Sequence, residues 1–140
     1  MNHLSLGYLL GSALQKQQDY LLSALNGMDV SIREYGAMMI LKNNQGLTQL
    51  ETGNLLQMDR TSIGKLIDTL SDREWVERKQ KPTDRRAYQL YLTEKGKAII
   101  AQLEQLALSA NDSYLSKLDN DERKQLLNIL EKLIKENENE

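Results

Sequence analysis

The sequence predicts an α+β fold that is mostly helical, in which a pair of short helices precedes one antiparallel hairpin and longer helices lie near both chain ends. Three observations support this expectation. Apolar residues recur at helical spacing near both ends. Tyr88, Leu90 and Leu92 alternate with Gln89 and Tyr91, which is the period of a strand. Three capping boxes, each a Ser, Thr or Asp followed three positions later by Glu, mark helix starts.

The first two helices are predicted from spacing and from their end signals. Apolar residues at helical spacing run from about Leu4 to Leu25, and the Asn26-Gly27 pair ends that pattern. Ser31 and Glu34 form the first capping box, so a second helix is expected from Ser31 to the polar segment 43–46.

A helix-turn-helix is predicted next. The capping box of Thr48 and Glu51 starts a short helix that ends near Gln57, and another helix starts between Asp59 and Thr61. The apolar stripe of this helix leaves a small-polar and basic face outward, made of Thr61, Ser62, Lys65, Asp68 and Thr69. In DNA-reading proteins, one helix of such a pair braces while the second enters the major groove.

Residues 75–80 and 87–92 predict the two strands of a hairpin with a basic, turn-forming tip. Pro82, the only proline, can pre-set the turn. Arg85 and Arg86 stand beside one acid, Asp84. Such a tip is suited to reach along a phosphate backbone or into a narrow groove.

The C-terminal part predicts two more helices. Thr93 is a good N-cap for a long helix that runs to about Tyr114, and Asp119 with Glu122 forms the third capping box. The last residues, 136–140, are expected to fray. The first helix and the last two are apolar on one face, which must be buried somewhere. The economical answer is a two-fold dimer that packs these helices together.

Composition excludes several classes of protein. The chain has 140 residues, which indicates a single domain. It has no cysteine, which excludes disulfides, thiolate metal sites and thiol redox sensing. The single histidine, His3, excludes a histidine triad or a multi-histidine metal site within one chain. No metal or cofactor is therefore expected, an enzyme is disfavoured, and no catalytic residues are assigned.

Location and charge follow from the same inspection. No apolar run approaches the roughly 20 residues of a membrane helix, and the first residues lack a secretory signal, so a cytoplasmic protein is expected. The net charge of −2 does not indicate a nucleic-acid partner, but seven cations lie between Arg78 and Lys97 against Asp84 and Glu94 alone. One basic face can exist on a mildly acidic molecule.

Three motifs carry a resemblance to a known family. They are Asp84-x-Arg86 followed by Leu90-x-Leu92-Thr93-x-x-Gly96; Leu47-Thr48-Gln49 leading to Asp59-Arg60-Thr61-Ser62-Ile63 and Leu66-Ile67-Asp68-x-Leu70; and Ser31-x-x-Glu34-Tyr35. In this order and spacing, the chain resembles the MarR family of winged helix-turn-helix transcriptional regulators over essentially its whole length. It departs from the family pattern at Thr52 and Gly53, where Leu and Ala are usual, and at Glu74, where a glycine commonly closes the recognition helix.

The resemblance implies one domain over residues 1–140. A winged helix-turn-helix lobe spans about residues 30–92, with dimerisation helices at about 1–29 and 93–140. It also implies that Arg86 enters a minor groove and that Asp84 orients it. A pocket for a small aromatic or phenolic effector is implied between the dimerisation helices and the lobe. Its candidate lining residues are Tyr8, Tyr20, Tyr35, Met38 and Met39, and the alternative for each is a plain core or interface residue.

The predicted function is that of a sequence-specific, double-stranded DNA-binding regulator. The resemblance implies that repression is the commoner outcome. The residues expected to meet DNA are Thr48, Thr61, Ser62, Lys65, Arg85 and Arg86, with Asp84 orienting Arg86. Each has a simpler alternative: Thr48 as a helix cap only, the α-helical residues as a polar surface, and Arg85 and Arg86 as solvated turn residues. The alternative for the whole chain is a winged-helix protein-interaction module that does not read DNA.

Overall fold

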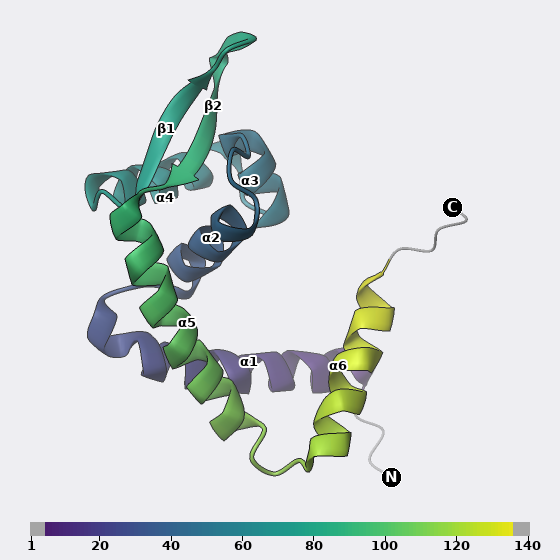
Figure 1. Cartoon of the computed structure of the whole chain (residues 1–140). Coiled ribbons are helices and arrows are strands. Elements are labelled where there is room, and N and C mark those ends of the chain that lie inside the picture. The colour runs from purple at the N-terminus through teal and green to yellow at the C-terminus, as the bar shows by residue number, and fades with distance from the viewer. Residues whose placement is uncertain (1–4, 136–140) are drawn as a thin grey trace.

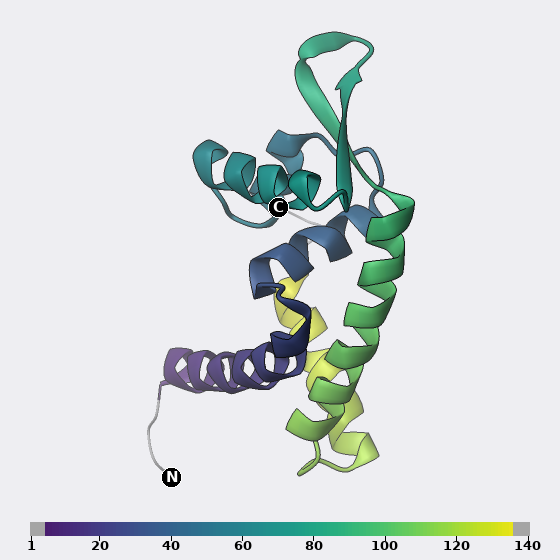
Figure 2. The same cartoon turned by 90° about the vertical axis from the view of Figure 1, so that its left-hand side faces the viewer.

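The computed structural model describes residues 5–135, so His3 and the expected fraying of residues 136–140 lie outside the described part. Two lobes are visible: the hairpin and three short helices form one, and longer helices form the other (Figures 1 and 2). The elements are α1 (Leu6–Leu25), the 3-10 helix η1 (Asn26–Met28), α2 (Ile32–Asn43), α3 (Gln49–Leu55), α4 (Arg60–Asp72), β1 (Val76–Lys81), β2 (Asp84–Leu92), α5 (Glu94–Tyr114) and α6 (Asn120–Ile134). The predicted winged helix-turn-helix with flanking helices is confirmed.

Side-chain caps fix where the helices begin. All three predicted capping boxes are present, at the starts of α2, α3 and α6. Asp59 caps α4 by accepting the Ser62 N–H at 2.7 Å. Thr93 caps α5 by accepting the Gly96 N–H at 2.9 Å. Because each cap satisfies backbone donors that the first turn leaves open, these starts are set by local sequence.

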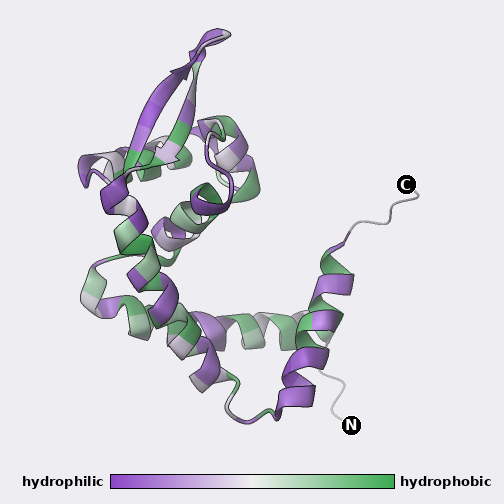
Figure 3. Cartoon of the chain, in the orientation of Figure 1, coloured by the Kyte–Doolittle hydropathy of each residue, from purple (hydrophilic) through white to green (hydrophobic). Residues whose placement is uncertain are grey.

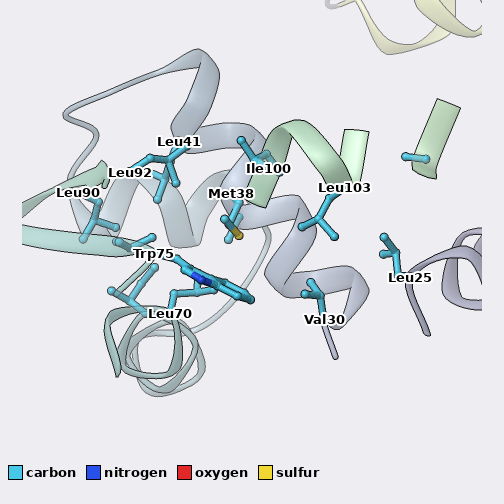
Figure 4. Close-up of a cluster of buried hydrophobic side chains, with 14 of the residues drawn as sticks. Leu25, Val30, Met38, Leu41, Leu70, Trp75, Leu90, Leu92, Ile100 and Leu103 are labelled. Atoms are coloured by element: carbon cyan, nitrogen blue, oxygen red, sulfur yellow. The ribbon is translucent and has the colours of Figure 1, made fainter. Parts of the chain in front are cut away.

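One hydrophobic core joins the winged lobe to α5 (Figure 4). Helices α2 and α4, strand β2 and helix α5 all contribute to it, and their large buried side chains include Met38, Leu41, Ile67, Leu70, Leu90, Leu92, Ile100 and Leu103. Each such side chain contributes about 1.5–3 kcal/mol by leaving water. The position of the helix-turn-helix relative to α5 is therefore fixed by shared packing.

The base of the wing has a third, strand-like edge that the sequence did not reveal. β1 and β2 pair in antiparallel register from Val76 with Leu92 to Gln80 with Tyr88. On the other edge of β2, the Leu90 N–H donates to the Leu47 carbonyl at 2.8 Å, and the Gly46 N–H donates to the Leu90 carbonyl at 2.9 Å. The segment that leads into α3 is thereby bonded to the wing.

The start of the second strand, predicted at residue 87, was placed three residues too late. The turn consists of Pro82 and Thr83, and β2 begins at Asp84. Lys81 pairs with Asp84 while its neighbour Gln80 pairs with Tyr88, so residues 85–87 bulge out of the ladder. A bulge re-aims side chains and bends a strand. Arg85 and Arg86 are thus presented by an irregular strand end.

A close joint connects α4, β1 and α5. The Thr93 N–H donates to the Trp75 carbonyl at 3.0 Å, and the Thr93 hydroxyl donates to the Glu74 carbonyl. Gly96 lies directly against the Trp75 carbonyl, and a Cβ on Gly96 would collide with the Trp75 backbone. This contact gives a physical reason for Thr93-x-x-Gly96, the motif that ends the wing signature.

The departures in α3 are accommodated by packing against α4. Thr52 is fully buried, and its hydroxyl donates to the Thr48 carbonyl at 2.9 Å. Gly53 is also buried, and an added Cβ would lie 3.2 Å from Cγ2 of Ile63. The glycine therefore allows close approach of the two helices, which offsets its poor helix propensity.

Helix α6 has no buried residue within the described chain, and Figures 1 and 3 show it standing clear of the winged lobe. Leu127, Ile129, Leu133 and Ile134 are all more than half exposed. α1 also exposes leucines along its length, although it packs on α5 through Leu21 and Leu25. These faces have no cover in a single protomer.

The end of α4 yields a stability prediction. Glu74 has φ +62°, and hydrogen bonds from Trp75 N–H to the Leu70 carbonyl and from Glu74 N–H to the Ser71 carbonyl close the helix as a Schellman motif. Glycine adopts this left-handed conformation without strain. We expect Glu74→Gly to raise the free energy of unfolding by about 1 kcal/mol in urea denaturation.

The control is Glu74→Ala, which keeps the strain and removes only the exposed pair between Glu74 and Lys95 at 3.6 Å. It is expected to change stability by no more than a few tenths of a kcal/mol. Equal stabilisation by both variants would show that the left-handed conformation is not the cause.

Candidate nucleic-acid interface

A concave surface lies between α3, α4 and the wing. Its hollow has a volume of about 530 Å³. Its lining comes from α3, α4 and β2: Gln49, Leu50, Arg60, Ile63, Asp84, Arg86, Ala87 and Tyr88. The start of the predicted recognition helix and the predicted wing arginine therefore share one surface, although they are more than twenty positions apart in sequence.

The residues predicted on α4 lie on its outer face. Thr61 and Lys65 are exposed and Ser62 is half-buried, while Ile63 and Ile67 face the core. This arrangement follows from one apolar stripe at helical spacing. The outer face is therefore available to a partner along the first two turns of α4.

Thr48 forms two hydrogen bonds with Glu51 at the start of α3. Its hydroxyl accepts the Glu51 N–H at 3.1 Å, and its own N–H donates to the Glu51 carboxylate at 3.1 Å. The Thr48 hydroxyl, and secondly the Thr48 backbone N–H, interact with the Glu51 carboxylate and hold its pKa below its ordinary value. The capping role of Thr48 is present in the structure, and contact with a phosphate stays a prediction.

Asp84 acts on the backbone of Arg86. Its carboxylate accepts the Arg86 N–H at 3.0 Å, and it takes part in no ion pair with the Arg86 guanidinium among the described contacts. Such a contact across two positions fixes the local chain direction. Asp84 thus shapes the bulge from which Arg86 projects, and the Arg86 side chain, which is exposed, stays available to a partner.

Positive charge at this surface is not compensated by pairing. Arg60, Lys65, Lys81, Arg85 and Arg86 take part in none of the ion pairs found between residues 5 and 135. Lys79 of β1, and Lys95 and Lys97 at the start of α5, do pair with glutamates. The uneven pairing concentrates cationic character between the wing and α4, despite the net charge of −2.

Sequence inspection missed two arginines that tie elements together. Arg78 of β1 reaches Asp68 of α4 at 2.7 Å and Gln49 of α3 at 3.1 Å. Arg73, at the end of α4, donates to the Asp29 carbonyl at 2.7 Å and lies 3.4 Å from the Glu34 carboxylate. No local pattern identifies either contact, because the partners are distant in sequence.

Comparison with known proteins identifies the family. The sequence model of the MarR family matches residues 30–88, from the entry of α2 into the distal part of the wing. A cysteine-to-serine mutant of MarR from Escherichia coli has 26% sequence identity and a TM-score of 0.88, over 96% of this chain and 100% of that chain. Residues 30–88 of this chain form a MarR-family winged helix-turn-helix.

Further relatives agree with this assignment. A curated protein named for regulation of the hcr operon of Thauera aromatica is 31% identical over 102 residues, which are 73% of this chain and only 61% of that protein. The same MarR mutant complexed with operator DNA gives a TM-score of 0.83 at 27% identity, over 93% and 94% of the two chains. The transcriptional repressor CouR, bound to a DNA duplex, gives 0.86 at 27% identity, over 94% and 93%.

The five candidate effector-lining residues do not converge. Tyr35 and Met39 line a hollow of about 310 Å³ between α2 and α5, together with Glu104, Ala107, Leu108 and Asn111. Met38 is fully buried in the core instead. Tyr20 packs against Tyr114 in a tilted arrangement with ring centroids 5.6 Å apart, and Tyr8 is exposed on α1. The structure thus brings together two of the five.

The chemistry of this hollow is mixed. Burial, and secondly the nearby Glu104 carboxylate, raise the pKa of the Tyr35 hydroxyl above its ordinary value. Glu104 pairs with Lys42 at 2.6 Å.

Within the described residues, no group of three His, Cys, Asp or Glu side chains could hold a metal ion, and no helix is long and apolar enough to cross a membrane.

The cap of α4 yields a pH prediction. The Ser62 backbone N–H holds the pKa of Asp59 below its ordinary value of 3.8. The folded pKa is depressed, so this cap stabilises the fold above the unfolded pKa and is lost as pH falls through the folded pKa. Asn is also a good N-cap and does not titrate. We expect Asp59→Asn to reduce the loss of unfolding free energy between about pH 6 and about pH 3.

Asp72→Asn is the matched control, because Asp72 is an exposed aspartate at the other end of the same helix. It is expected to leave the pH dependence of urea unfolding near that of the parent. The same flattening in both variants would contradict the assignment to the cap.

Proposed function

We propose that this chain is a sequence-specific double-stranded DNA-binding transcriptional regulator. The observation that carries the proposal is the concave surface on which α4 and the Arg86 bulge present unpaired cations together. Operator DNA in the MarR mutant structure, and a DNA duplex in the CouR structure, support extension to this chain. Because the curated relative is matched over 61% of its length, its activity comes to this chain as part of the proposal.

In the proposed complex, α4 lies in a major groove and the wing follows the duplex to the adjacent minor groove. Thr61, Ser62 and Lys65 face bases and phosphates, with Lys65 on a guanine edge or a phosphate oxygen. Arg86 enters the minor groove, where a guanidinium is attracted by the negative potential of a narrow groove. Arg85 contributes a phosphate contact or remains solvated.

The proposed assembly is a homodimer built from α1, α5 and α6. Fifteen residues of α6 form a helix without a buried side chain, and a second copy supplies the missing cover. Two-fold symmetry then places two α4 helices on one face of DNA, with half-sites about one helical turn apart in a pseudo-palindrome. Residues 30–92 form the DNA-binding lobe of each protomer in this proposal.

We further propose repression with release by a small aromatic or phenolic ligand. The hollow between α2 and α5 lies where the winged lobe meets a dimerisation helix, and Tyr35 and Met39 offer an aromatic and a polarisable wall. A ligand that alters the spacing of the two lobes changes DNA affinity without touching DNA.

The experiment that tests the function is a fluorescence-anisotropy titration on DNA from upstream of the chain's own gene, with scrambled DNA as control, at two salt concentrations. We expect preference for the upstream DNA and binding that weakens steeply with salt, since each neutralised phosphate adds about 0.9 to the slope. No binding to either duplex would favour the protein-interaction alternative. That alternative has some support in the exposed Leu50 and Leu55 of α3.

Arg86→Ala tests the wing in the same assay. Loss of the minor-groove contact is expected to cost about 1–3 kcal/mol of binding free energy, with little change in folding stability because the side chain is exposed. Arg86→Lys keeps the charge and removes the planar fork, so it should restore only part of the affinity. Unchanged affinity in Arg86→Ala would refute the wing role.

Leu133→Glu tests the dimer. Leu133 is 65% exposed in the protomer, so a glutamate there should not disturb the fold of a single chain. In a dimer interface, the same substitution would bury two unpaired carboxylates. We expect a monomer by sedimentation at micromolar concentration. Leu55→Glu, which changes a leucine 59% exposed on α3, should remain dimeric. A stable Leu133→Glu dimer would refute this interface.

A further inference from the structure

The side chain of Arg78 joins three elements. It leaves β1 and reaches α4, where Nη2 donates to the Asp68 carboxylate at 2.7 Å and to the Gly64 carbonyl at 3.4 Å. Its Nε donates to the side-chain oxygen of Gln49 in α3 at 3.1 Å. The side chain is only 26% exposed. One guanidinium therefore bonds the wing to both helices of the helix-turn-helix.

The position of Arg78 along the wing gives these contacts their importance. Arg78 lies opposite Leu90, the last fully buried residue of β2 before the tip. Further out, the wing projects from the lobe with exposed or half-buried residues (Figure 1). A two-stranded hairpin without a core is marginally stable by itself. Its direction is consequently set where it leaves the core.

The charge of Arg78 is already used within the protein. Its pairing with Asp68 distinguishes it from Arg86, which takes part in no ion pair among the described residues. Lysine could not reproduce the contacts, because they require several donors in a planar fork. Arg78 is thus suited to orient the wing and poorly placed to add a phosphate contact.

We propose that Arg78 is a positioning residue, which fixes the wing relative to α3 and α4 and thereby sets where Arg86 reaches. The position of the wing is a property of the free protein, while its consequence for DNA rests on the proposed function. The two parts are tested separately, so failure of one is distinguishable from failure of the other.

The first test measures the wing without DNA. The chain has no cysteine, so Thr83→Cys in the turn and Asn54→Cys on α3 provide two specific spin-label sites, both exposed. Labelled protein is diluted with unlabelled chain so that each labelled protomer is observed alone. Arg78→Ala should broaden the distance distribution between the labels by electron paramagnetic resonance, with Arg78→Lys intermediate.

The matched control is Lys79→Ala. Lys79 is the next residue on β1, carries the same charge and pairs with Glu77 at 3.4 Å on the wing itself. Its removal should leave the distance distribution unchanged. Urea unfolding of every variant verifies that the core is intact. An unchanged distribution in Arg78→Ala, or equal broadening in Lys79→Ala, would overturn the positioning role.

The second test is a double-mutant cycle on upstream DNA. If Arg78 acts through Arg86, Arg78→Ala should weaken binding about tenfold in the parent and less than about twofold in Arg86→Ala. Lys79→Ala should have the same effect in both backgrounds. Equal losses for Arg78→Ala in both backgrounds would overturn action through Arg86. Absence of DNA binding by the parent would refute the proposed function, and the distance measurement would still decide the position of the wing.

Discussion

The contact between Gly96 and the backbone of Trp75 is the constraint on which the arrangement of the two lobes depends. Trp75 follows the end of α4 and precedes β1, and Gly96 lies in the first turn of α5. The Trp75 carbonyl accepts the Thr93 N–H at 3.0 Å, while a Cβ on Gly96 would collide with the same group. The end of α4, the start of β1 and the first turn of α5 therefore pack so closely that no side chain fits at position 96.

This joint turns local geometry into long-range placement. Helix α5 runs for 21 residues from the joint toward α1, and the core that contains Ile100 and Leu103 continues along it. Protein interiors are densely packed and transmit small displacements. In our proposal, a change in how two copies of α5 sit together therefore moves both α4 helices as rigid bodies. The Arg78 contacts extend the same rigidity from the joint into the wing.

Local features of the fold could be predicted because their causes are local. The capping boxes at Ser31, Thr48 and Asp119 each depend on two residues three positions apart, and all are present. The outward face of α4 followed from helical spacing for the same reason. The hairpin followed from strand alternation, and the family resemblance added its interpretation as a wing and the division into a lobe and flanking helices.

Features that join distant segments could not be predicted in this way. The bulge at residues 85–87 arises from strand register, and the hydrogen bond between Leu47 and Leu90 joins residues forty-three positions apart. Met38 and Met39 are neighbours with the same side chain, yet the orientation of α2 points Met38 into the core and Met39 toward the hollow between α2 and α5. The positive φ of Glu74 likewise has no local signal, because a glutamate does not by itself favour the left-handed conformation.

The most direct measurement is hydroxyl-radical footprinting of the DNA bound by the protein. We expect two protected patches on one face of the duplex, about one helical turn apart, with flanking minor-groove protection that disappears in Arg86→Ala. A single patch, or flanking protection that persists in Arg86→Ala, would contradict a dimer that reads DNA through α4 and the wing.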